Sequence, residues 1–458
     1  MHPYLVIAIN FFMSLSLLII LHELGHFIPA RLFKIRVEKF YLFFDIKFSL
    51  FKKKIGETIY GIGWLPLGGY VKISGMIDES MDKEQMAQEP KEWEFRSKPA
   101  WQRLIIMVGG VVVNVVVGFV IYIILTASYG TPQSTGTDLK YGLGFPKTLE
   151  DIGFKQGDQV LLVNNDTLDY APHLNKNLIF RDVKTVSVLR DNELLDIIIP
   201  EDIGNRLFLN GVPSKLTPRF PFSIGFVQEG SKADSLNIPT GAKLTSVAGH
   251  KIDYYTDYTY AINNYVETNK PFTINWEHEG KSYSGQTQFG TKEVTSFIFF
   301  KRTVDEDKVL GIKPKALDED YQKISKVSYT FSESVSAGLE RGYWVVHDYI
   351  VQFKYVFTKK GASQLGGFGT IAKLYPDTFN WLAFWETTAW ISFVLAVMNI
   401  LPIPALDGGH VMFLIYEIIT GRKPGDKFLE KAQIIGIVIL LSLMLYANGN
   451  DLFKALFG

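Results

Sequence analysis

Four stretches of the sequence hold apolar residues over lengths that suit a membrane-spanning helix. They cover roughly Tyr4 to Phe33, Leu104 to Ala127, Trp381 to Leu401 and Ala432 to Ala447. A bilayer core takes about 20 apolar residues in a helix, so the first three stretches predict full spans and the last predicts a short one. We therefore expect a polytopic α-helical membrane protein with four transmembrane helices.

The segment between the second and third spans carries no apolar run of membrane length and predicts a soluble region. It contains an internal repeat, in which a glycine-aromatic turn precedes a Gly-x-x-Φ-x-x-Val strand (Φ, apolar) and then a hairpin. The two copies begin at Gly142-Leu143-Gly144-Phe145 and at Ile224-Gly225-Phe226. We expect two small β-rich domains, followed by an amphipathic helix over 325–360 that is too polar to span and lies on the outer membrane surface.

Residues 37–76 alternate aromatic and polar side chains and are rich in glycine, which predicts a strand followed by a hairpin or a strand with tight turns. Gly61, Gly63, Gly68 and Gly69 would allow another backbone to approach closely. An ordinary surface hairpin is the alternative. Residues 77–99 predict a charged cytoplasmic loop.

The basic residues set an orientation. Lys and Arg follow the first span, precede the second and separate the third from the fourth, so the positive-inside rule places both chain ends and the β-rich domains outside. The N-terminal run lacks a basic flank and a cleavage site, which favours a retained anchor over a signal peptide. Hydrophobic residues make up 47% of the 458 residues and the net charge is zero, so we expect no nucleic-acid partner. The absence of cysteine excludes disulfides and cysteine-ligated zinc.

The first span contains His22-Glu23-Leu24-Gly25-His26. Residues four apart share one face of a helix, so His22 and His26 can hold one metal ion while Glu23 acts beside it as general base. Ionisable side chains inside an apolar segment are costly, and their default interpretation is functional. The alternative is that the span ends at Leu21 and the histidines lie at the membrane interface.

A third ligand is expected after the third span. Pro402 and Pro404 break the helix there, and Asp407 follows them. A catalytic zinc site keeps three protein ligands and one open position, which His22, His26 and Asp407 would provide. His410 is the rival ligand, although the Gly-Gly turn should carry it past the site, and His347 should lie on the wrong side of the bilayer.

The two motifs, His22-Glu23-x-x-His26 and Asn399-x-x-Pro402-x-Pro404-x-x-Asp407-Gly408, together resemble the site-2 protease family of intramembrane zinc metalloproteases. The repeated β-rich region resembles two tandem PDZ domains, as in RseP-type bacterial members. The resemblance covers essentially the whole chain. It departs at Val108-Gly109-Gly110-Val111, where members often have Ala-Gly-Pro, and at Gly367-Phe368-Gly369-Thr370-Ile371 in place of Gly-Pro-x-x-Ile.

The resemblance implies one Zn²⁺ held by His22, His26 and Asp407, with Glu23 as the catalytic base. It implies single-span membrane proteins as substrates, such as an anti-sigma factor after a first cut and remnant signal peptides, in regulated intramembrane proteolysis during stress responses. It also implies a bacterial inner-membrane location. Substrate contacts would come from Asn399, Asn114, Gly61, Gly63, Gly68, Gly69 and Tyr70, and PDZ peptide contacts from Gly142, Leu143, Gly144, Phe145, Ile224, Gly225 and Phe226. Asn114 could instead only bond a neighbouring helix.

These expectations divide the chain into eight parts: 1–36, the first transmembrane helix; 37–99, strands, a membrane-associated β-hairpin and a loop; 100–129, the second transmembrane helix; 130–218 and 219–295, two extracytoplasmic PDZ-like domains; 296–360, a connector with the surface helix; 361–416, the third transmembrane region; and 417–458, a loop and the fourth transmembrane helix. Two other functions remain open. A catalytically inactive peptide-binding scaffold is opposed by the complete ligand set with Glu23, and a metal transporter by the lack of a polar line through the second and fourth spans. The PDZ-like domains could also lack peptide affinity.

Overall fold

The computed structural model of the chain describes residues 2–66, 68–76, 89–296, 300–305, 308–316 and 318–457. It divides into two compact units, which we call the membrane unit (1–130 and 328–454) and the β unit (131–327). The predicted charged loop falls mostly on residues 77–88, which lie outside the described residues.

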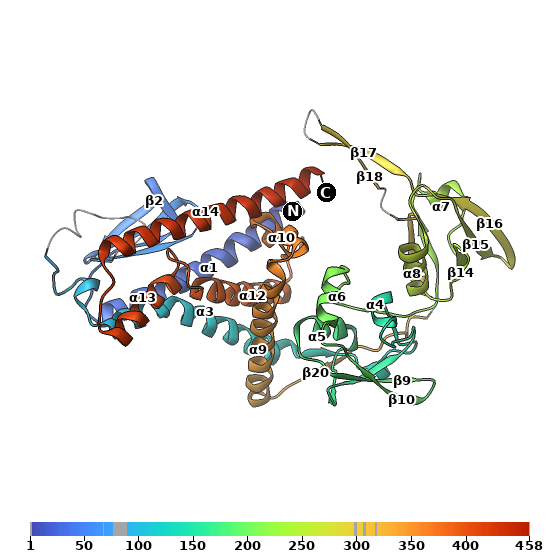
Figure 1. The fold of residues 1–458 in the computed structure, drawn as a ribbon, viewed down its shortest axis with the longest axis horizontal. Helices are drawn as coiled ribbons and strands as arrows, with labels where there is room; N and C mark the ends of the chain where they lie inside the picture. Colours follow the sequence, from blue (N-terminus) through green and yellow to red (C-terminus); the bar gives the residue numbers. More distant parts are fainter. Residues whose placement is uncertain are drawn as a thin grey trace. The chain divides into compact units, whose positions relative to one another are not determined.

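The described residues of the membrane unit form the helices α1 (Pro3–Leu32), α3 (Ala100–Tyr129), α9 (Phe331–Val356), α10 (Lys359–Gln364), α11 (Phe368–Ala372), α12 (Trp381–Ile400), α13 (Asp407–Thr420) and α14 (Asp426–Phe457) (Figure 1). Among the described residues, four helices are long and apolar enough to cross a bilayer, namely α1, α3, α12 and the Lys427–Leu456 part of α14. The four predicted spans are therefore present as helices.

The fourth span is longer than predicted. The sequence suggested a helix of sixteen residues, whereas α14 has 32. It continues through Asn448 and Asp451, whose side chains accept hydrogen bonds from the backbone N–H groups of Phe368, Gly367 and Thr370. These polar residues end the apolar run but not the helix, because α10 and α11 lie beside them.

The two helices α1 and α3 touch at their backbones. A Cβ atom placed on Gly109 of α3 would lie 2.0 Å from the carbonyl oxygen of Gly25 on α1. Only glycine allows this approach, and it brings α3 against the helix face that carries the histidines.

The predicted amphipathic helix is α9, and it packs on the spans. A Cβ on Gly338 would meet Ile123 of α3, and one on Gly342 would meet the ring of Phe119. Arg341 forms an ion pair with Glu386 of α12 at 2.5 Å. In the described residues α9 is not among the helices that could span a membrane.

Residues 37–73 form one mixed sheet of four strands, β1 (Val37–Leu42), β2 (Phe44–Ile55), β3 (Thr58–Leu65) and β4 (Tyr70–Ile73), in the order β2-β3-β1-β4. β1 is parallel to β3 and antiparallel to β4. The prediction of a hairpin over 61–70 is wrong, because β3 and β4 both pair with β1 and lie on its two sides. The hairpin in this sheet is β2–β3 instead.

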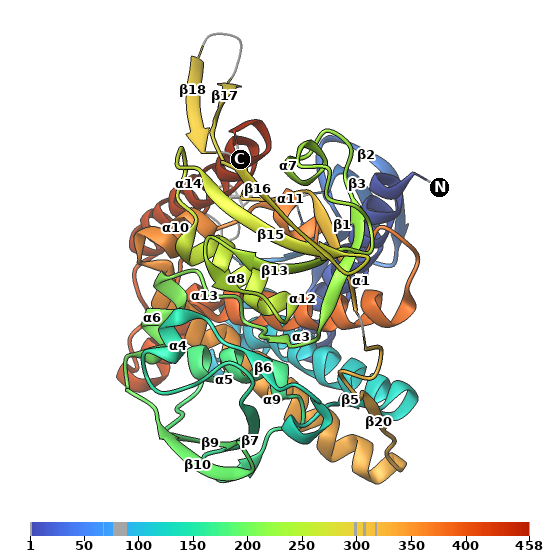
Figure 2. The same cartoon turned by 90° about the vertical axis from the view of Figure 1, so that its right-hand side faces the viewer.

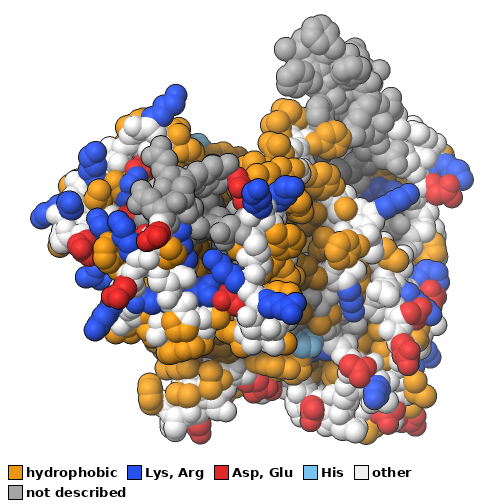
Figure 3. Space-filling model, turned by 60° about the vertical axis from the view of Figure 1, so that its left-hand side comes forward, with side chains coloured by type: hydrophobic (Ala, Val, Ile, Leu, Met, Phe, Trp, Pro, Cys, Tyr) orange, Lys and Arg blue, Asp and Glu red, His pale blue; other side chains and the backbone are white. Residues whose placement is uncertain are grey.

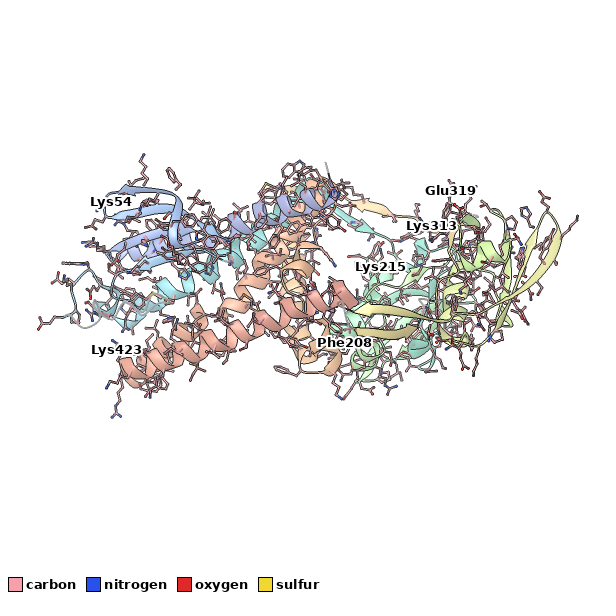
Figure 4. The ribbon with its side chains drawn as sticks, turned by 90° about the horizontal axis from the view of Figure 1, so that it is seen from above. Lys54, Phe208, Lys215, Lys313, Glu319 and Lys423 are labelled. Atoms are coloured by element: carbon pink, nitrogen blue, oxygen red, sulfur yellow. The ribbon has the colours of Figure 1, made fainter. Side chains whose placement is uncertain are left out.

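Basic side chains gather at one end of the membrane unit. On the face drawn in Figure 3, Lys and Arg lie around the sheet, and hydrophobic side chains cover much of the rest. Figure 4 labels Lys54, near the tip of the β2–β3 hairpin, and Lys423, between α13 and α14, at the same end of this unit.

The β unit contains the predicted repeat. Its sheets have the orders β10-β9-β7-β8 and β14-β13-β15-β16, in which equivalent strands occupy equivalent places. Figure 2 labels β7, β9 and β10 of the first sheet and β13, β15 and β16 of the second. A two-stranded pair accompanies each sheet, β6 with β11 in the first copy and β12 with β19 in the second. The elements are β5 (Thr131–Gln133), β6 (Leu143–Gly144), α4 (Lys147–Glu150), β7 (Gln159–Val163), β8 (Asp166–Thr167), α5 (Leu174–Phe180), β9 (Thr185–Arg190), β10 (Glu193–Ile198), α6 (Ile203–Leu209), β11 (Thr217–Pro218), β12 (Phe222–Val227), α7 (Lys232–Ser235), β13 (Lys243–Val247), β14 (His250–Lys251), α8 (Tyr255–Tyr265), β15 (Phe272–His278), β16 (Lys281–Thr287), β17 (Thr291–Ser296), β18 (Phe300–Asp305), β19 (Ile312–Ala316) and β20 (Ser325–Val327).

The second copy extends beyond the predicted boundary at residue 295. β19 completes its two-stranded pair, and Leu310 is fully buried in its core. The sequence did not reveal this strand because it follows a long excursion through β17 and β18. The β unit begins and ends on one ladder, since Thr131 of β5 pairs with Val327 of β20.

Candidate metal centre

Three side chains from two distant segments converge in the membrane unit. His22 and His26 lie one turn apart on α1, and Asp407 is the first residue of α13. Nε2 of His22 lies 3.3 Å from Nε2 of His26, and Oδ2 of Asp407 lies 3.3 and 3.4 Å from these two nitrogens. In the described residues, this is the group of His, Asp and Glu side chains whose spacing suits a metal ion.

The donor set fits zinc. Ligands about 2.0–2.1 Å from a tetrahedral ion lie roughly 3.3 Å from one another, which matches the three separations above. Oδ2 of Asp407 is buried and makes no hydrogen bond within the described residues. A buried carboxylate oxygen without a donor is costly, and a cation at the centre of the triangle would satisfy it.

The second nitrogen of His26 fixes the orientation of its ring. Nδ1 lies 2.8 Å from the carbonyl oxygen of Ile106 on α3. A carbonyl only accepts, so Nδ1 carries the proton and donates it, which leaves the lone pair of Nε2 directed at the metal position.

Glu23 lies beside the metal cluster at the edge of the sheet. Its carboxylate accepts a hydrogen bond from the backbone N–H of Val71 in β4. Both border a cavity of about 730 Å³ that also contains His22, His26 and Asp407. The predicted base is therefore held next to an open space and a strand edge.

The loop before Asp407 is tightly bent. α12 ends at Ile400, and Ala405 adopts a φ of +86°, which is uncommon for a residue with a side chain. A Cβ on Gly408 would lie 2.2 Å from the carbonyl oxygen of Leu401. The proline-rich loop thus folds back on the start of α13 and places Asp407 opposite α1.

The expected course of the chain after Asp407 is wrong. Gly408 and Gly409 lie in the first turn of α13 and do not form a separate turn. His410 therefore stays close and lines the same cavity, but it does not belong to the metal cluster of the described residues. Glycine has a low helix propensity, and the close contact at Gly408 explains why a glycine stands in this first turn.

The residues predicted to contact the substrate do not all lie at the cavity. Asn399 does, with Nδ2 3.4 Å from Nε2 of His22, and so does Asn114. Gly68, Gly69 and Tyr70 line it at the start of β4. Gly61 and Gly63 lie in β3, which is separated from β4 by β1. A Cβ on Gly61 would strike the ring of Tyr41, and one on Gly63 would strike the backbone of Phe44. These two glycines therefore allow close packing inside the sheet, which corrects the prediction that they contact the substrate.

A polar cluster at the cavity was not predicted. The hydroxyl of Tyr70 donates to Asp45 at 2.7 Å, and Nζ of Lys39 lies 3.4 Å from the same carboxylate. Burial raises the pKa of Asp45, but these two neighbours together hold it below its usual value. The alternation of aromatic and polar residues predicted that these side chains lie on strands, but it did not predict which residues of neighbouring strands face one another.

Some backbone N–H groups of both predicted PDZ loops already have partners within the protein. The N–H of Leu143 donates to Asp158, and that of Phe145 to the side chain of Gln156. In the second copy, the N–H of Ile224 donates to Ala242 in the equivalent place. The repeat is thus consistent in detail, whereas peptide binding at these loops stays a prediction.

The model of peptidase family M50 matches residues 10–443. The chain belongs to this family. It is also similar over nearly its whole length to bacterial proteins that carry the name "putative zinc metalloprotease". It is 26% identical to one from Neisseria meningitidis (97% of this chain, 98% of the relative), 27% to one from Clostridium acetobutylicum (98% and 96%) and 25% to one from Vibrio cholerae (97% and 97%).

Membership of the M50, or site-2 protease, family makes this chain a zinc metalloprotease with membrane-spanning helices. The predicted family, enzyme class and cofactor are confirmed. The individual ligands, the catalytic base and the substrate contacts are proposals.

Proposed function

We propose that this M50 protease hydrolyses peptide bonds inside the membrane-spanning segments of single-span membrane proteins. The observation that carries the proposal is the position of the metal cluster on α1, an apolar helix of 30 residues. His22 lies about 27 Å along the helix from Tyr4, within the length of a bilayer core. A site at this depth meets bonds that a soluble protease cannot reach.

The orientation follows from charge. The basic end of the membrane unit, which contains the sheet and the α13–α14 loop, faces the cytoplasm of a bacterial inner membrane. Both chain ends and the β unit then lie outside, and the cleavage site lies near the cytoplasmic side.

Four side chains carry the chemistry. His22, His26 and Asp407 hold Zn²⁺, which when bound polarises a carbonyl and lowers the pKa of a water molecule. Glu23 takes a proton from the attacking water and returns it to the leaving amine. The N–H of Val71 orients the Glu23 carboxylate for both transfers.

The substrate binds as an added strand on β4. Within the described residues, β4 ends the sheet order and pairs on one side only, with β1. A transmembrane helix shields its peptide bonds by its own hydrogen bonds, so it must unwind before cleavage. Strand addition to Tyr70–Ile73 replaces the lost backbone bonds and brings the peptide to Glu23. The amide of Asn399, beside His22, contacts the same peptide.

The β unit selects substrates by size. Its two PDZ-like domains stand between the second and third spans in the sequence and admit only proteins whose extracytoplasmic domain has been trimmed. Membrane-anchored anti-sigma factors after a first cut and remnant signal peptides meet this description.

The test uses the full chain, purified in detergent, and a tagged single-span substrate without its outer domain. The native protein, Glu23→Gln and a chelator-treated sample are compared, and mass spectrometry locates the cut. We expect a cut inside the span that both controls lose, with zinc still bound in Glu23→Gln. An inactive native protein with one bound zinc would support a scaffold, and a chain that moves zinc across vesicles without proteolysis would support a transporter.

A further inference from the structure

Asn114 is a fully buried polar residue in the middle of the apolar helix α3. A carboxamide inside a membrane span is costly unless its donors and acceptors have partners. Its backbone oxygen accepts a hydrogen bond of 2.7 Å from Ser392 of α12, which ties the two helices together. The side chain faces the metal cluster, where Nδ2 lies 3.2 Å from Nδ1 of His22.

The chemistry of ligation decides which atom of the amide belongs next to His22. Nε2 of His22 points at His26 and Asp407, so its lone pair must face the metal position. The proton of the neutral ring is then on Nδ1, which becomes a donor and requires an acceptor. Nδ2 of Asn114 cannot accept, whereas Oδ1 can, and Oδ1 is buried without a hydrogen-bond partner in the described residues.

A half-turn about the last side-chain torsion exchanges the two amide atoms. It places Oδ1 at hydrogen-bond distance from Nδ1 of His22. The same helix already supplies the acceptor for the other histidine, because the carbonyl oxygen of Ile106 accepts from Nδ1 of His26. Ile106 and Asn114 are two turns apart on α3, and Gly110 lies between them, where a Cβ would lie 2.5 Å from Nε2 of His26.

We propose that Asn114 is a positioning residue of the zinc site, whose side-chain oxygen accepts the Nδ1 proton of His22 and directs Nε2 to the metal. α3 then orients both imidazoles, one through a backbone carbonyl and one through a side chain. This role differs from the predicted contact with substrate. It rests on zinc ligation by the membrane unit and does not depend on which substrate is cut.

The test measures zinc affinity of the purified full chain by competition with a chromophoric chelator. Asn114→Leu has a similar volume and no acceptor, Asn114→Ala removes the amide alone, and Asn114→Asp keeps an acceptor and loses the donor. Loss of an outer-shell partner weakens metal binding about 10–100-fold, so we expect this loss in the first two variants and near-native affinity in Asn114→Asp. Ser392→Ala is the control, since it breaks the hydrogen bond to the Asn114 backbone without touching the ring.

Cleavage assays separate this role from substrate binding. Excess zinc should restore the kcat of Asn114→Ala at an unchanged KM. Native zinc affinity in Asn114→Leu and Asn114→Ala would overturn the proposal, and a raised KM that zinc does not correct would assign Asn114 to the substrate. Equal loss of zinc in Asn114→Asp and Asn114→Ala would also overturn it, because it would show that the amide donates. The zinc affinities alone decide the proposal if the chain cuts no transmembrane substrate.

Discussion

Helices α1 and α3 and the edge strand β4 line the same cavity, yet the side formed by the two helices is closed and the side formed by β4 is open. At the α1–α3 side, Gly25 and Gly109 bring two helix backbones together, and the side chains of His22 and His26 contact α3. At the second, β4 has a partner on one side only within the described residues. Under the proposed function, the metal-binding half of the site is assembled by the fold alone, whereas the substrate-binding half would be completed by the peptide.

Removing a ligand tests the closed half most severely. Asp407→Ala should weaken zinc binding by more than about 100-fold, beyond the effect of an outer-shell partner, and abolish cleavage. Metal analysis of the purified protein and the cleavage assay check this together. Stoichiometric zinc in Asp407→Ala would remove Asp407 from the ligand set.

The backbone contact can be broken without changing a ligand. A Cβ at Gly109 would meet the Gly25 carbonyl, so Gly109→Val should separate α1 from α3 and weaken zinc binding about 10–100-fold. Gly449→Val is the matched control, because a Cβ on this α14 glycine meets nothing within 4 Å. Equal zinc affinities of the two variants would show that the close approach does not support the metal site.

Two substitutions of one residue in β4 test the open, substrate-binding half. Val71→Pro removes the N–H that holds Glu23, and Val71→Ala retains it. A lost hydrogen bond to a charged group costs about 1.5–3 kcal/mol, so Val71→Pro should cleave about 10–100-fold more slowly with zinc still bound. A substrate with a helix-breaking residue in its span should be cut faster by the native enzyme. Equal rates of Val71→Pro and Val71→Ala would show that the Val71 N–H does not orient Glu23, and a helix breaker without effect would exclude unwinding of the substrate onto β4.

Deletion of the β unit is expected to have the smallest effect on the cleavage rate. Both halves of the site lie in the membrane unit, so replacing 131–327 by a short linker should change the rate on trimmed substrate less than about threefold. Pairing of Thr131 with Val327 brings the two ends of the deletion together. The same variant should cut untrimmed substrate, which the native enzyme should leave intact. If untrimmed substrate stays intact while trimmed substrate is cut, the size filter is excluded.

The sequence predicted the parts of the site that depend on local spacing. His22 and His26 follow from helical periodicity, and the four spans follow from apolar length. Asp407 was predicted because two prolines and a carboxylate in an apolar segment are costly without a function. The order of the sheet was not predictable, since β3 and β4 both pair with β1 and no local pattern specifies such a register. The contact of Gly25 with Gly109 could not be predicted either, because a glycine in a membrane helix does not indicate which helix packs against it.

The proposed ligands would also set the time at which the enzyme becomes active during its synthesis. His22 and His26 leave the ribosome at the start of the chain, whereas Asp407 follows near its end. At about 5–20 residues per second, the nascent chain passes on the order of tens of seconds in the translocation machinery with two ligands and no third. With the proposed ligands, a chain that has not yet reached Asp407 would therefore have no complete zinc site.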